Sequence, residues 1–337
     1  MRNYIWLVGA FALLLLSGIA NASEQQPEKK QFGIEIAPEW WYAKWNPSFS
    51  DNCVSNDCGL FNSGYSIAPK VLSGLSVSGF YGKSSIFVNY LDSRLAPGSA
   101  SSTSGDVRRW RELVGGILFW MGGSWYLESS VLSGNFSGTA WGDEWTRGVG
   151  TTRRNLSVDT SLTEGEVDAL FKTSLNCGGG GFKCPDGFEL GYRVDSYHLP
   201  ALVEVYDDRG LMKIAFEDTR FLTNYLVLGA REFPDTKQDG WTWGISDLKG
   251  FFGVTAAKNA DMNNKGGFSA GGEGECGVEY KKSWASAFVG FKGKVVYTTV
   301  GSKPEVGTDQ GQHYYGTSHL EMTDTYYGPL ARLTVRF

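Results

Sequence analysis

Two long segments near the carboxyl end of the chain alternate strictly between apolar and polar side chains. In Phe268–Tyr280 the even positions are apolar or small, whereas three of the odd positions are glutamates. The alternation returns in Ala285–Thr299, where valines and aromatic residues occupy one set of positions and lysines occupy part of the other. A period of two is typical of a β-strand with one apolar face. The two segments therefore predict a β-hairpin.

The length of these strands separates two all-β architectures. Both exceed the roughly five or six residues of an average globular strand, and they suit a tilted strand that crosses a bilayer, which needs roughly 9–11 residues. A membrane barrel turns its apolar face to lipid and its polar face inward, whereas a soluble sandwich buries the apolar face. If Tyr280 pairs with Ala285, the two apolar faces coincide and Glu273 lies opposite Lys292, and we predict this register.

The connections between the alternating segments are short on one side and long on the other. Short turns are expected at residues 82–84 and 122–124. The expected long polar connections are residues 46–63, 95–107, 137–163, 257–265 and 301–316. Short turns that alternate with long loops are typical of outer-membrane barrels, and a sandwich has no reason to segregate its loops in this way.

The strand count depends on residues 163–250, where the pattern is weakest. Residues 167–175 fit a strand or part of a loop, and residues 221–233 fit a strand or a short helix. Residues 241–245 and 252–256 suggest a hairpin around residues 247–250. We predict an all-β chain with one antiparallel up-and-down transmembrane β-barrel over residues 32–337. About twelve strands are expected, and ten or fourteen remain open.

The first 22 residues have the three parts of a secretory signal peptide. Arg2 supplies the positive charge, Tyr4–Leu16 is an apolar run, and Ala20 and Ala22 are the small residues that precede a cleavage site. The apolar run is shorter than the roughly 20 residues of a membrane-spanning helix. We therefore expect residues 1–22 to be a cleaved signal peptide and residues 23–31 to be a flexible lead-in.

Four of the five cysteines fall into two closely spaced pairs. In an exported protein, Cys53 with Cys58 and Cys177 with Cys184 predict two local disulfides. A zinc site made of these four residues is disfavoured, because both spacings exceed the two to four residues usual for zinc ligands. We expect no metal and no cofactor. Cys276 is left over and fits a small apolar position on a strand.

Composition excludes fewer classes of protein than the alternation of apolar and polar residues does. The net charge of −5 and the isoelectric point near 5.4 argue against a nucleic-acid partner, which would favour a basic stripe. A mean hydropathy of −0.23 would ordinarily indicate a soluble protein. A barrel gives a similar average, because its lipid-facing side chains are averaged with a polar lumen and polar loops.

The chain ends in an alternating strand whose final residue is aromatic. Leu333, Val335 and Phe337 share one face of this strand. A terminal phenylalanine on such a strand resembles the assembly signal of Gram-negative outer-membrane β-barrel proteins. The resemblance covers Gln31–Phe337 and concerns the architecture, not one particular barrel family. It implies location in the outer membrane of a Gram-negative bacterium, contact with outer-membrane lipid, and insertion by the barrel-assembly machinery that reads the last strand.

In such a barrel the charged strand residues would line the lumen. The candidates are Glu35, Glu39, Glu128, Glu189, Arg193, Asp195, Glu273, Glu275, Glu279, Lys292, Lys294, Arg332 and Arg336. They could select solutes by charge, or they could form a salt-bridge network that fills a barrel of intermediate width. The glutamates of 268–280 face lysines of 285–299, which favours neutralisation inside the lumen over a filter of one sign.

We predict a channel or transporter that carries small solutes across the outer membrane. The alternative is a structural or adhesive surface barrel that acts through its long loops, and a barrel lipid hydrolase is a third possibility. A hydrolase would usually need a histidine base, and His198, His313 and His319 show no constellation with serine and acid, so no catalytic residue is predicted. Tryptophans near strand ends predict interfacial girdles. They are Trp40, Trp41, Trp45, Trp110, Trp120, Trp125, Trp241, Trp243 and Trp284.

Overall fold

The computed structural model shows a chain built from β-strands. It describes residues 32–45, 48–50, 62–93, 110–146, 150–173, 182–183, 185–199, 205–206, 212–213, 219–232, 240–258, 265–282, 284–301, 308–309, 312–313 and 319–336. The expected signal peptide and lead-in, both cysteine pairs, and Phe337 lie outside the described residues. Across the described part, no helix has the length and hydropathy needed to span a bilayer.

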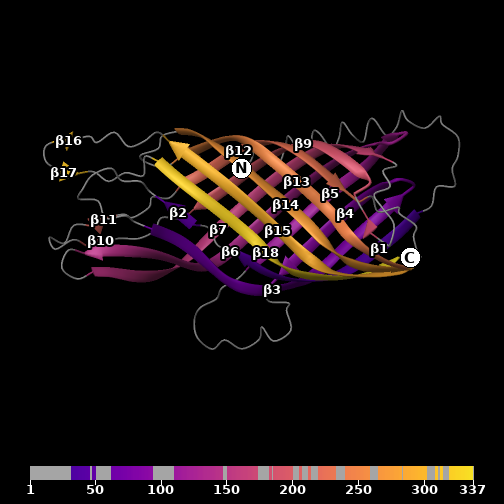
Figure 1. Cartoon of the computed structure of the whole chain (residues 1–337), viewed down its shortest axis with the longest axis horizontal. Helices are drawn as coiled ribbons and strands as arrows, with labels where there is room; N and C mark the ends of the chain where they lie inside the picture. The colour runs from indigo at the N-terminus through magenta and orange to yellow at the C-terminus, as the bar shows by residue number, and fades with distance from the viewer. Residues whose placement is uncertain are drawn as a thin grey trace.

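Twelve long strands pair side by side in chain order and form a closed barrel (Figure 1). The first strand, β1, pairs antiparallel with both β3 and the last strand, β18, and these two pairings close the sheet. The twelve are β1 (Phe32–Trp45), β3 (Asn62–Tyr81), β4 (Ser84–Asp92), β5 (Trp110–Gly122), β6 (Trp125–Thr146), β7 (Gly150–Lys172), β9 (Gly187–Leu199), β12 (Thr219–Arg231), β13 (Gly240–Lys258), β14 (Lys265–Lys282), β15 (Ala285–Gly301) and β18 (His319–Arg336). The predicted up-and-down barrel of about twelve strands is confirmed.

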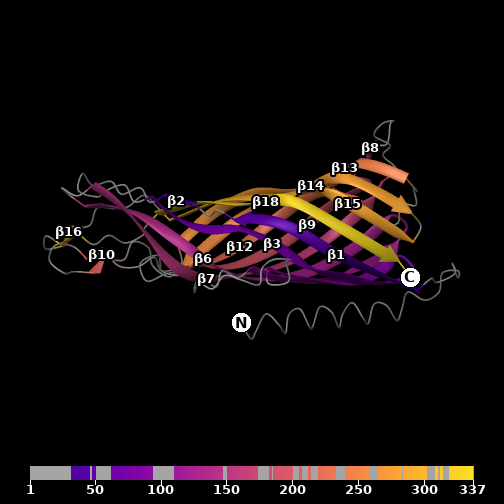
Figure 2. The ribbon, with the colours of Figure 1, turned by 90° about the horizontal axis from the view of Figure 1, so that it is seen from below.

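Six short strands accompany the barrel within the described ranges. They are β2 (Ser48–Ser50), β8 (Phe182–Lys183), β10 (Val205–Tyr206), β11 (Met212–Lys213), β16 (Thr308–Asp309) and β17 (Gln312–His313). Strand β2 pairs with β18 and β3, and β10 pairs with β11 as β16 does with β17. Strand β8 pairs parallel with β13, beside which it lies in Figure 2.

The two ends of the barrel differ in how they connect the strands. Strand β1 begins and β18 ends at the same end, which also holds the tight turns at Gly82–Lys83 and Gly123–Ser124. Gly82 and Gly123 have φ angles of 61° and 58°, which a two-residue hairpin turn requires and which glycine adopts without strain. We call this end the turn end and the opposite end the loop end.

The barrel is apolar outside and polar inside. Val295 on β15 and Leu228 on β12 are about half exposed, whereas Arg193 on β9 and Glu166 on β7 are buried. Aromatic side chains are exposed around the turn end, where Trp125 contacts Phe171. These residues are Phe32, Tyr81, Trp125, Phe171, Phe188, Trp241 and Trp284. Such a distribution matches a lipid-facing surface with an interfacial aromatic girdle.

Two of the tryptophans assigned to the girdle face inward. Trp120 packs against buried apolar side chains, while its neighbour Met121 is exposed. Trp41 is buried at 3% exposure, whereas its neighbour Trp40 is 40% exposed. The Lys292 ammonium lies 5.0 Å from the Trp41 ring centroid. Because adjacent residues of a strand point to opposite faces, only one of two consecutive residues can meet lipid, and the predictions for Trp41 and Trp120 are wrong.

The predicted hairpin near the carboxyl end has the right faces and the wrong register. Tyr280 pairs with Ala287, and Glu273 lies opposite Lys294. Strand β14 continues through Lys282, which pairs with Ala285, so the turn is tighter than expected. A shift of two residues leaves every side chain on its face, and the alternation therefore could not separate the two registers.

Two predictions between residues 137 and 258 are wrong. Residues 137–163, expected to be a loop, belong largely to β6 and β7, which stay paired to Thr146 and Gly150 and run on beyond the barrel at its loop end (Figures 1 and 2). Their polar composition indicated a loop. Strand pairing, however, is made by hydrogen bonds between backbone groups, so polar side chains do not prevent it. Residues 241–256, expected to be a hairpin, lie within the single strand β13. Residues 221–233, for which strand and helix were both open, begin inside β12.

A charge placed on the lipid-facing surface tests which face meets the membrane. Val295→Arg, near the middle of β15, is expected to cost about 2–4 kcal/mol of folding free energy in lipid vesicles, whereas Trp284→Arg at the turn end should cost about 0–1 kcal/mol. Urea titration of the vesicle-inserted protein measures both values. Equal costs at the two positions would contradict the assigned orientation in the membrane.

Candidate functional site

The lumen is crossed near its middle by a cluster of charged side chains that we call the lumen network. It consists of Glu164, Glu166, Arg193, Lys249, Glu273 and Lys294. These residues come from β7, β9, β13, β14 and β15, and the alternation of each strand turns them inward. The four members outside β7 lie at or next to the middle residue of their strands. The network therefore sits halfway between the two ends of the barrel.

Arg193 is the hub of the lumen network. Its Nη2 and Nη1 donate to the two carboxylate oxygens of Glu273 at 2.7 and 3.3 Å. Its Nε donates to Glu166 Oε2 at 2.5 Å and lies 3.4 Å from Glu164 Oε1. The guanidinium carbon is 4.7 Å from the centroid of the Phe251 ring. At 1% exposure, this side chain is held by three carboxylates and an aromatic face, as the planar donor fork of arginine allows.

Two lysines complete the lumen network. Lys249 Nζ donates to Glu166 Oε1 at 2.6 Å and lies 3.2 Å from Glu189 Oε1. Lys294 Nζ donates to Glu164 Oε2 at 2.8 Å and lies 3.7 Å from Glu273 Oε2. Both carboxylate oxygens of Glu164 and of Glu166 therefore face cations.

Several of these contacts connect walls that are far apart in the sheet. Strands β7 and β15 are separated by β9, β12, β13 and β14, so in a twelve-stranded barrel they stand almost opposite one another. The Glu164–Lys294 ion pair, which we call the cross-lumen bridge, therefore spans the interior. Arg193 and Glu273 are likewise separated by β12 and β13. The lumen is thus bridged by side chains at mid-height.

Apolar and hydroxyl side chains pack around the lumen network. Tyr225, Val227, Phe251 and Val296 form a buried cluster beside the network, and Leu118, Tyr126 and Leu170 form a second one nearer the turn end. Towards the loop end, four buried hydroxyls form a row across β12, β13, β14 and β15. The oxygen distances are 3.0 Å from Thr223 to Thr255, 2.5 Å from Thr255 to Ser269, and 2.8 Å from Ser269 to Thr298. These contacts satisfy the hydroxyls inside a filled section of the barrel.

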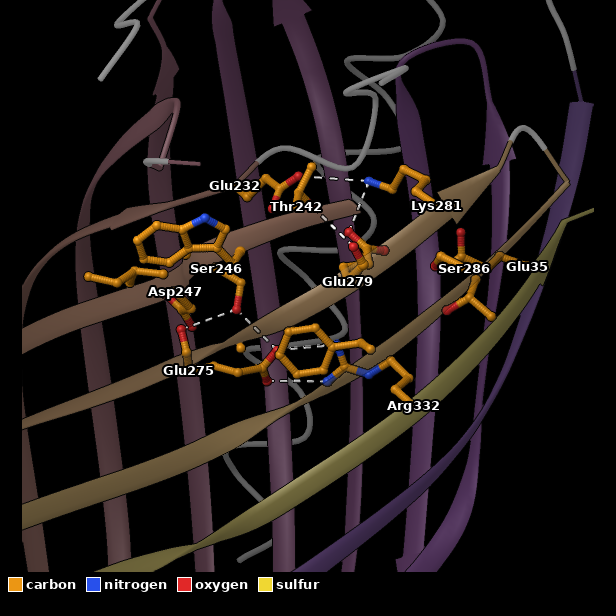
Figure 3. A pocket seen from close by; sticks show the side chains of 16 residues that line it. Glu35, Glu232, Thr242, Ser246, Asp247, Glu275, Glu279, Lys281, Ser286 and Arg332 are labelled. Atoms are coloured by element: carbon orange, nitrogen blue, oxygen red, sulfur yellow. Dashed lines mark hydrogen bonds and ion pairs between the residues drawn. The ribbon is translucent and has the colours of Figure 1, made fainter. Parts of the chain in front are cut away.

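A cavity of about 270 Å³ opens on the turn-end side of the network (Figure 3). Its charged lining is Glu35, Glu232, Asp247, Glu275, Glu279, Lys281 and Arg332. Arg332 bridges Glu39 and Glu275, with closest separations of 3.2 Å to each. Lys281 Nζ lies 3.7 Å from Glu232 and 3.4 Å from Glu279. The cavity is therefore lined by more carboxylates than cations.

A β-bulge in β13 places two consecutive polar residues at this cavity. The register with β14 shifts between Ile245 and Asp247, and both Ser246 and Asp247 line the cavity (Figure 3). Ser246 Oγ donates to the backbone oxygen of Glu275 at 3.2 Å and to its Oε1 at 3.1 Å. A bulge that re-aims side chains is a recurrent device beside functional sites.

The predicted lumen residues take part in this interior to different extents. Arg193, Glu273 and Lys294 belong to the lumen network, and Glu189 contacts its Lys249. Glu35, Glu275, Glu279 and Arg332 line the cavity. Glu39, Glu128 and Asp195 are buried, and Glu128 pairs with Arg231. Lys292 contacts the Trp41 ring. Arg336 is described only through its strand register, opposite Glu35. Leu333, part of the expected assembly signal, is exposed on the outer face.

Sequence reasoning missed half of the lumen network, together with several of its neighbours. The missed residues are Glu164, Glu166, Asp168, Arg231, Asp247, Lys249 and Lys281. A usable signal was present on β7, where Glu164, Glu166 and Asp168 alternate with apolar Val167, Ala169 and Phe171. The bulge at Ser246 broke the corresponding pattern on β13.

Of the three histidines considered as a catalytic base, His198 has a described side chain, whereas the side chains of His313 and His319 lie outside the description. Ser196 and His198 occupy outward positions of β9, whereas Asp195, which precedes Ser196, faces the lumen. Adjacent strand residues point to opposite faces, so Asp195 cannot orient His198.

No protein-family model matches this chain, and no curated protein matches it. Among solved structures, the chain is similar to the outer membrane protease OmpT from Escherichia coli, with 10% identity, a TM-score of 0.37, and coverage of 94% of this chain and 100% of that one. The β domain of the Bordetella autotransporter BrkA gives 11% identity and a TM-score of 0.33, covering 90% and 98% of the two chains. The Pseudomonas putida toluene transporter TodX gives 10% identity and a TM-score of 0.35, covering 92% of this chain and 90% of that one.

The chain's own architecture defines its class. Every backbone group in a membrane span needs a partner, and a closed barrel supplies one without a free sheet edge. An even number of tilted antiparallel strands, an apolar exterior with aromatic residues at one rim, and a charged interior are the features of an outer-membrane barrel. The protein is an outer-membrane β-barrel.

Proposed function

We propose that this barrel is a gated channel for small solutes, closed at rest by the lumen network. The supporting observation is that side chains make the closure: the cross-lumen bridge joins nearly opposite walls through Glu164 Oε2 and Lys294 Nζ at 2.8 Å. Long side chains can exchange partners without moving the barrel backbone. A pathway could therefore open while the ladder of strands stays intact.

Acidic groups outnumber basic ones in and around the lumen network, which is the proposed constriction. Glu189 and Asp195 of β9 and Asp168 of β7 are all buried beside the three acids and three bases of the lumen network. Six carboxylates thus face three cations. A narrow passage in which acidic side chains outnumber basic ones disfavours anions, so the proposed solutes are cationic or neutral.

Planar-bilayer recordings of the full chain test this proposal. The native protein is expected to open rarely, whereas Lys294→Met and Glu164→Gln each break the cross-lumen bridge. A charged hydrogen bond contributes about 1.5–3 kcal/mol, so either change should raise the open-to-closed ratio about 10- to 100-fold. In a KCl gradient the reversal potential should shift towards the equilibrium potential of potassium. The shift should be larger for Lys294→Met, because this change also removes a positive charge from the lumen.

Lys172→Met is the matched control. Lys172 Nζ lies 3.9 Å from Asp186 at the turn end, away from the cross-lumen bridge, and its loss should leave the open probability unchanged. If the native protein and both bridge variants are folded and remain silent, the channel proposal fails.

A silent barrel would favour the second candidate, a scaffold that displays its loop end. The observation behind it is the β6–β7 ribbon, whose strands of 22 and 23 residues far exceed the 13 residues of the neighbouring strands β5 and β9. Deleting the ribbon tip should then abolish adhesion to a surface or partner while leaving the barrel folded.

A further inference from the structure

Three carboxylates converge beside the lumen network, on the inner wall formed by β7 and β9. Glu166 and Asp168 come from β7 and Glu189 from β9, and one oxygen of each lies within 4.8 Å of the other two. All three residues are buried, with exposures of 4%, 1% and 4%. We call them the carboxylate triad.

Two glycines give the carboxylate triad its shape. Asp168 pairs across the ladder with Gly191, and Glu189 pairs with Gly229. A Cβ atom on Gly191 would lie 1.7 Å from Asp168 Oδ1, and one on Gly229 would lie 2.6 Å from Glu189 Oε1. Each carboxylate therefore leans over a strand position where only glycine leaves room. The backbone is arranged so that the acids approach one another.

The cations nearby do not balance the carboxylate triad. Lys249 Nζ contacts Glu166 at 2.6 Å and Glu189 at 3.2 Å, and Arg193 is shared among Glu166, Glu164 and Glu273. Asp168 Oδ1 is fully buried and has no hydrogen-bond partner among the described residues. A buried carboxylate needs a compensating charge or donor, because desolvation otherwise opposes its burial.

We propose that the carboxylate triad binds a divalent cation, and that the cation is Ca²⁺. Carboxylate oxygens are hard ligands, and Ca²⁺ accepts irregular sets of them at about 2.3–2.6 Å, so two oxygens on one ion lie up to about 5 Å apart. The 4.8 Å spread of the triad fits this limit. Mg²⁺ demands a nearly regular octahedron with shorter bonds and suits the triad less well. The site does not depend on the proposed channel function.

Lys249 competes with the ion. Its ammonium already occupies oxygens of Glu166 and Glu189, and its strand position lies directly opposite Glu273 on β14. An entering ion would displace Lys249 towards Glu273. Replacing this lysine should consequently strengthen ion binding, which is the opposite of what a merely structural ion pair would show.

The experiment is calcium titration of the full chain, refolded in detergent and freed of metal by a chelator. Calorimetry should detect one bound Ca²⁺ per chain, and the thermal unfolding temperature should rise with added Ca²⁺. Asp168→Asn should abolish both signals. Glu279→Gln, which removes a lumen carboxylate at the turn-end cavity, is the matched control and should bind Ca²⁺ as the native chain does.

Lys249→Met should bind Ca²⁺ at least about tenfold more tightly, since removing a nearby positive charge strengthens the local attraction for a cation. If Asp168→Asn does not refold, Glu189→Gln replaces it as the variant that must lose binding. No calorimetric signal for Ca²⁺ with the native chain, native-like binding by the triad variant, or unchanged affinity in Lys249→Met would each overturn the site. Tighter binding of Mg²⁺ than of Ca²⁺ would overturn the choice of ion.

Discussion

Replacing Arg193 by methionine is expected to destabilise the folded barrel by about 3–5 kcal/mol, because it removes one partner from a buried, hydrogen-bonded charge cluster. Glu164, Glu166 and Glu273 would lose their shared guanidinium. Lys249 and Lys294 would remain as their only cations within the lumen network. Equilibrium urea unfolding in lipid vesicles, followed by tryptophan fluorescence, measures the change as a lower midpoint at an unchanged slope.

Arg332→Met is the matched control for this prediction. Arg332 also bridges two glutamates, but its side chain is 30% exposed. Solvent hydrates part of this guanidinium, but its partner Glu39 is buried, so the loss of Arg332 should cost about 1–2 kcal/mol, less than the loss of Arg193. Arg193→Lys should fall between the two variants, since an ammonium cannot form the two-pronged contact with Glu273 while it also reaches Glu166. Equal stability of Arg193→Met and Arg332→Met would show that the lumen network does not hold the barrel together.

The barrel itself was predictable because a membrane strand differs at every second residue over its whole length. In 268–280 and 285–299 the alternation persists for more than ten residues, which identified both the faces and the membrane-spanning length. The register of the same hairpin was not predictable. Its faces are preserved by a shift of two residues, and the choice depends on how Lys281 and Lys282 extend β14.

The centre of the site was harder to predict, because two of its strands do not show their period clearly. On β13 the bulge at Ser246 changes the phase: Thr242 and Lys249 both face the lumen although they are an odd number of residues apart. On β7, Glu164, Glu166 and Asp168 follow directly after residues 137–163, whose polar composition indicates a loop.

Alternation also assigns a face without assigning a partner. It placed Arg193 and Lys294 in the lumen, but it could not show that Lys294 meets Glu164 from a strand 130 residues away in sequence. Which walls face one another depends on strand number, tilt and stagger after the barrel closes. The local sequence of one strand contains none of these quantities.

Lys294→Glu is expected to open the barrel more than any neutral substitution, because it replaces an attraction across the lumen with a repulsion. Glu164 Oε2 lies 2.8 Å and Glu273 Oε2 lies 3.7 Å from the present ammonium. Loss of a charged hydrogen bond alone should raise the open-to-closed ratio about 10- to 100-fold. Because Lys294→Glu also adds repulsion, it should raise this ratio about 100-fold or more. Single-channel recording measures this ratio, and a KCl gradient should report strong cation preference.

Lys292→Glu is the control that separates the bridge from the overall charge of the lumen. Lys292 lies on the same strand and face two residues away, and it contacts the Trp41 ring. Lys292→Glu changes the charge of the lumen by the same amount as Lys294→Glu but leaves the cross-lumen bridge intact, so the barrel should stay closed. Adding Glu164→Lys to Lys294→Glu should lower the open probability again, though incompletely, because Arg193 Nε lies 3.4 Å from the original Glu164 carboxylate. If Lys292→Glu opens the barrel as widely as Lys294→Glu, total lumen charge sets the closure and the cross-lumen bridge does not.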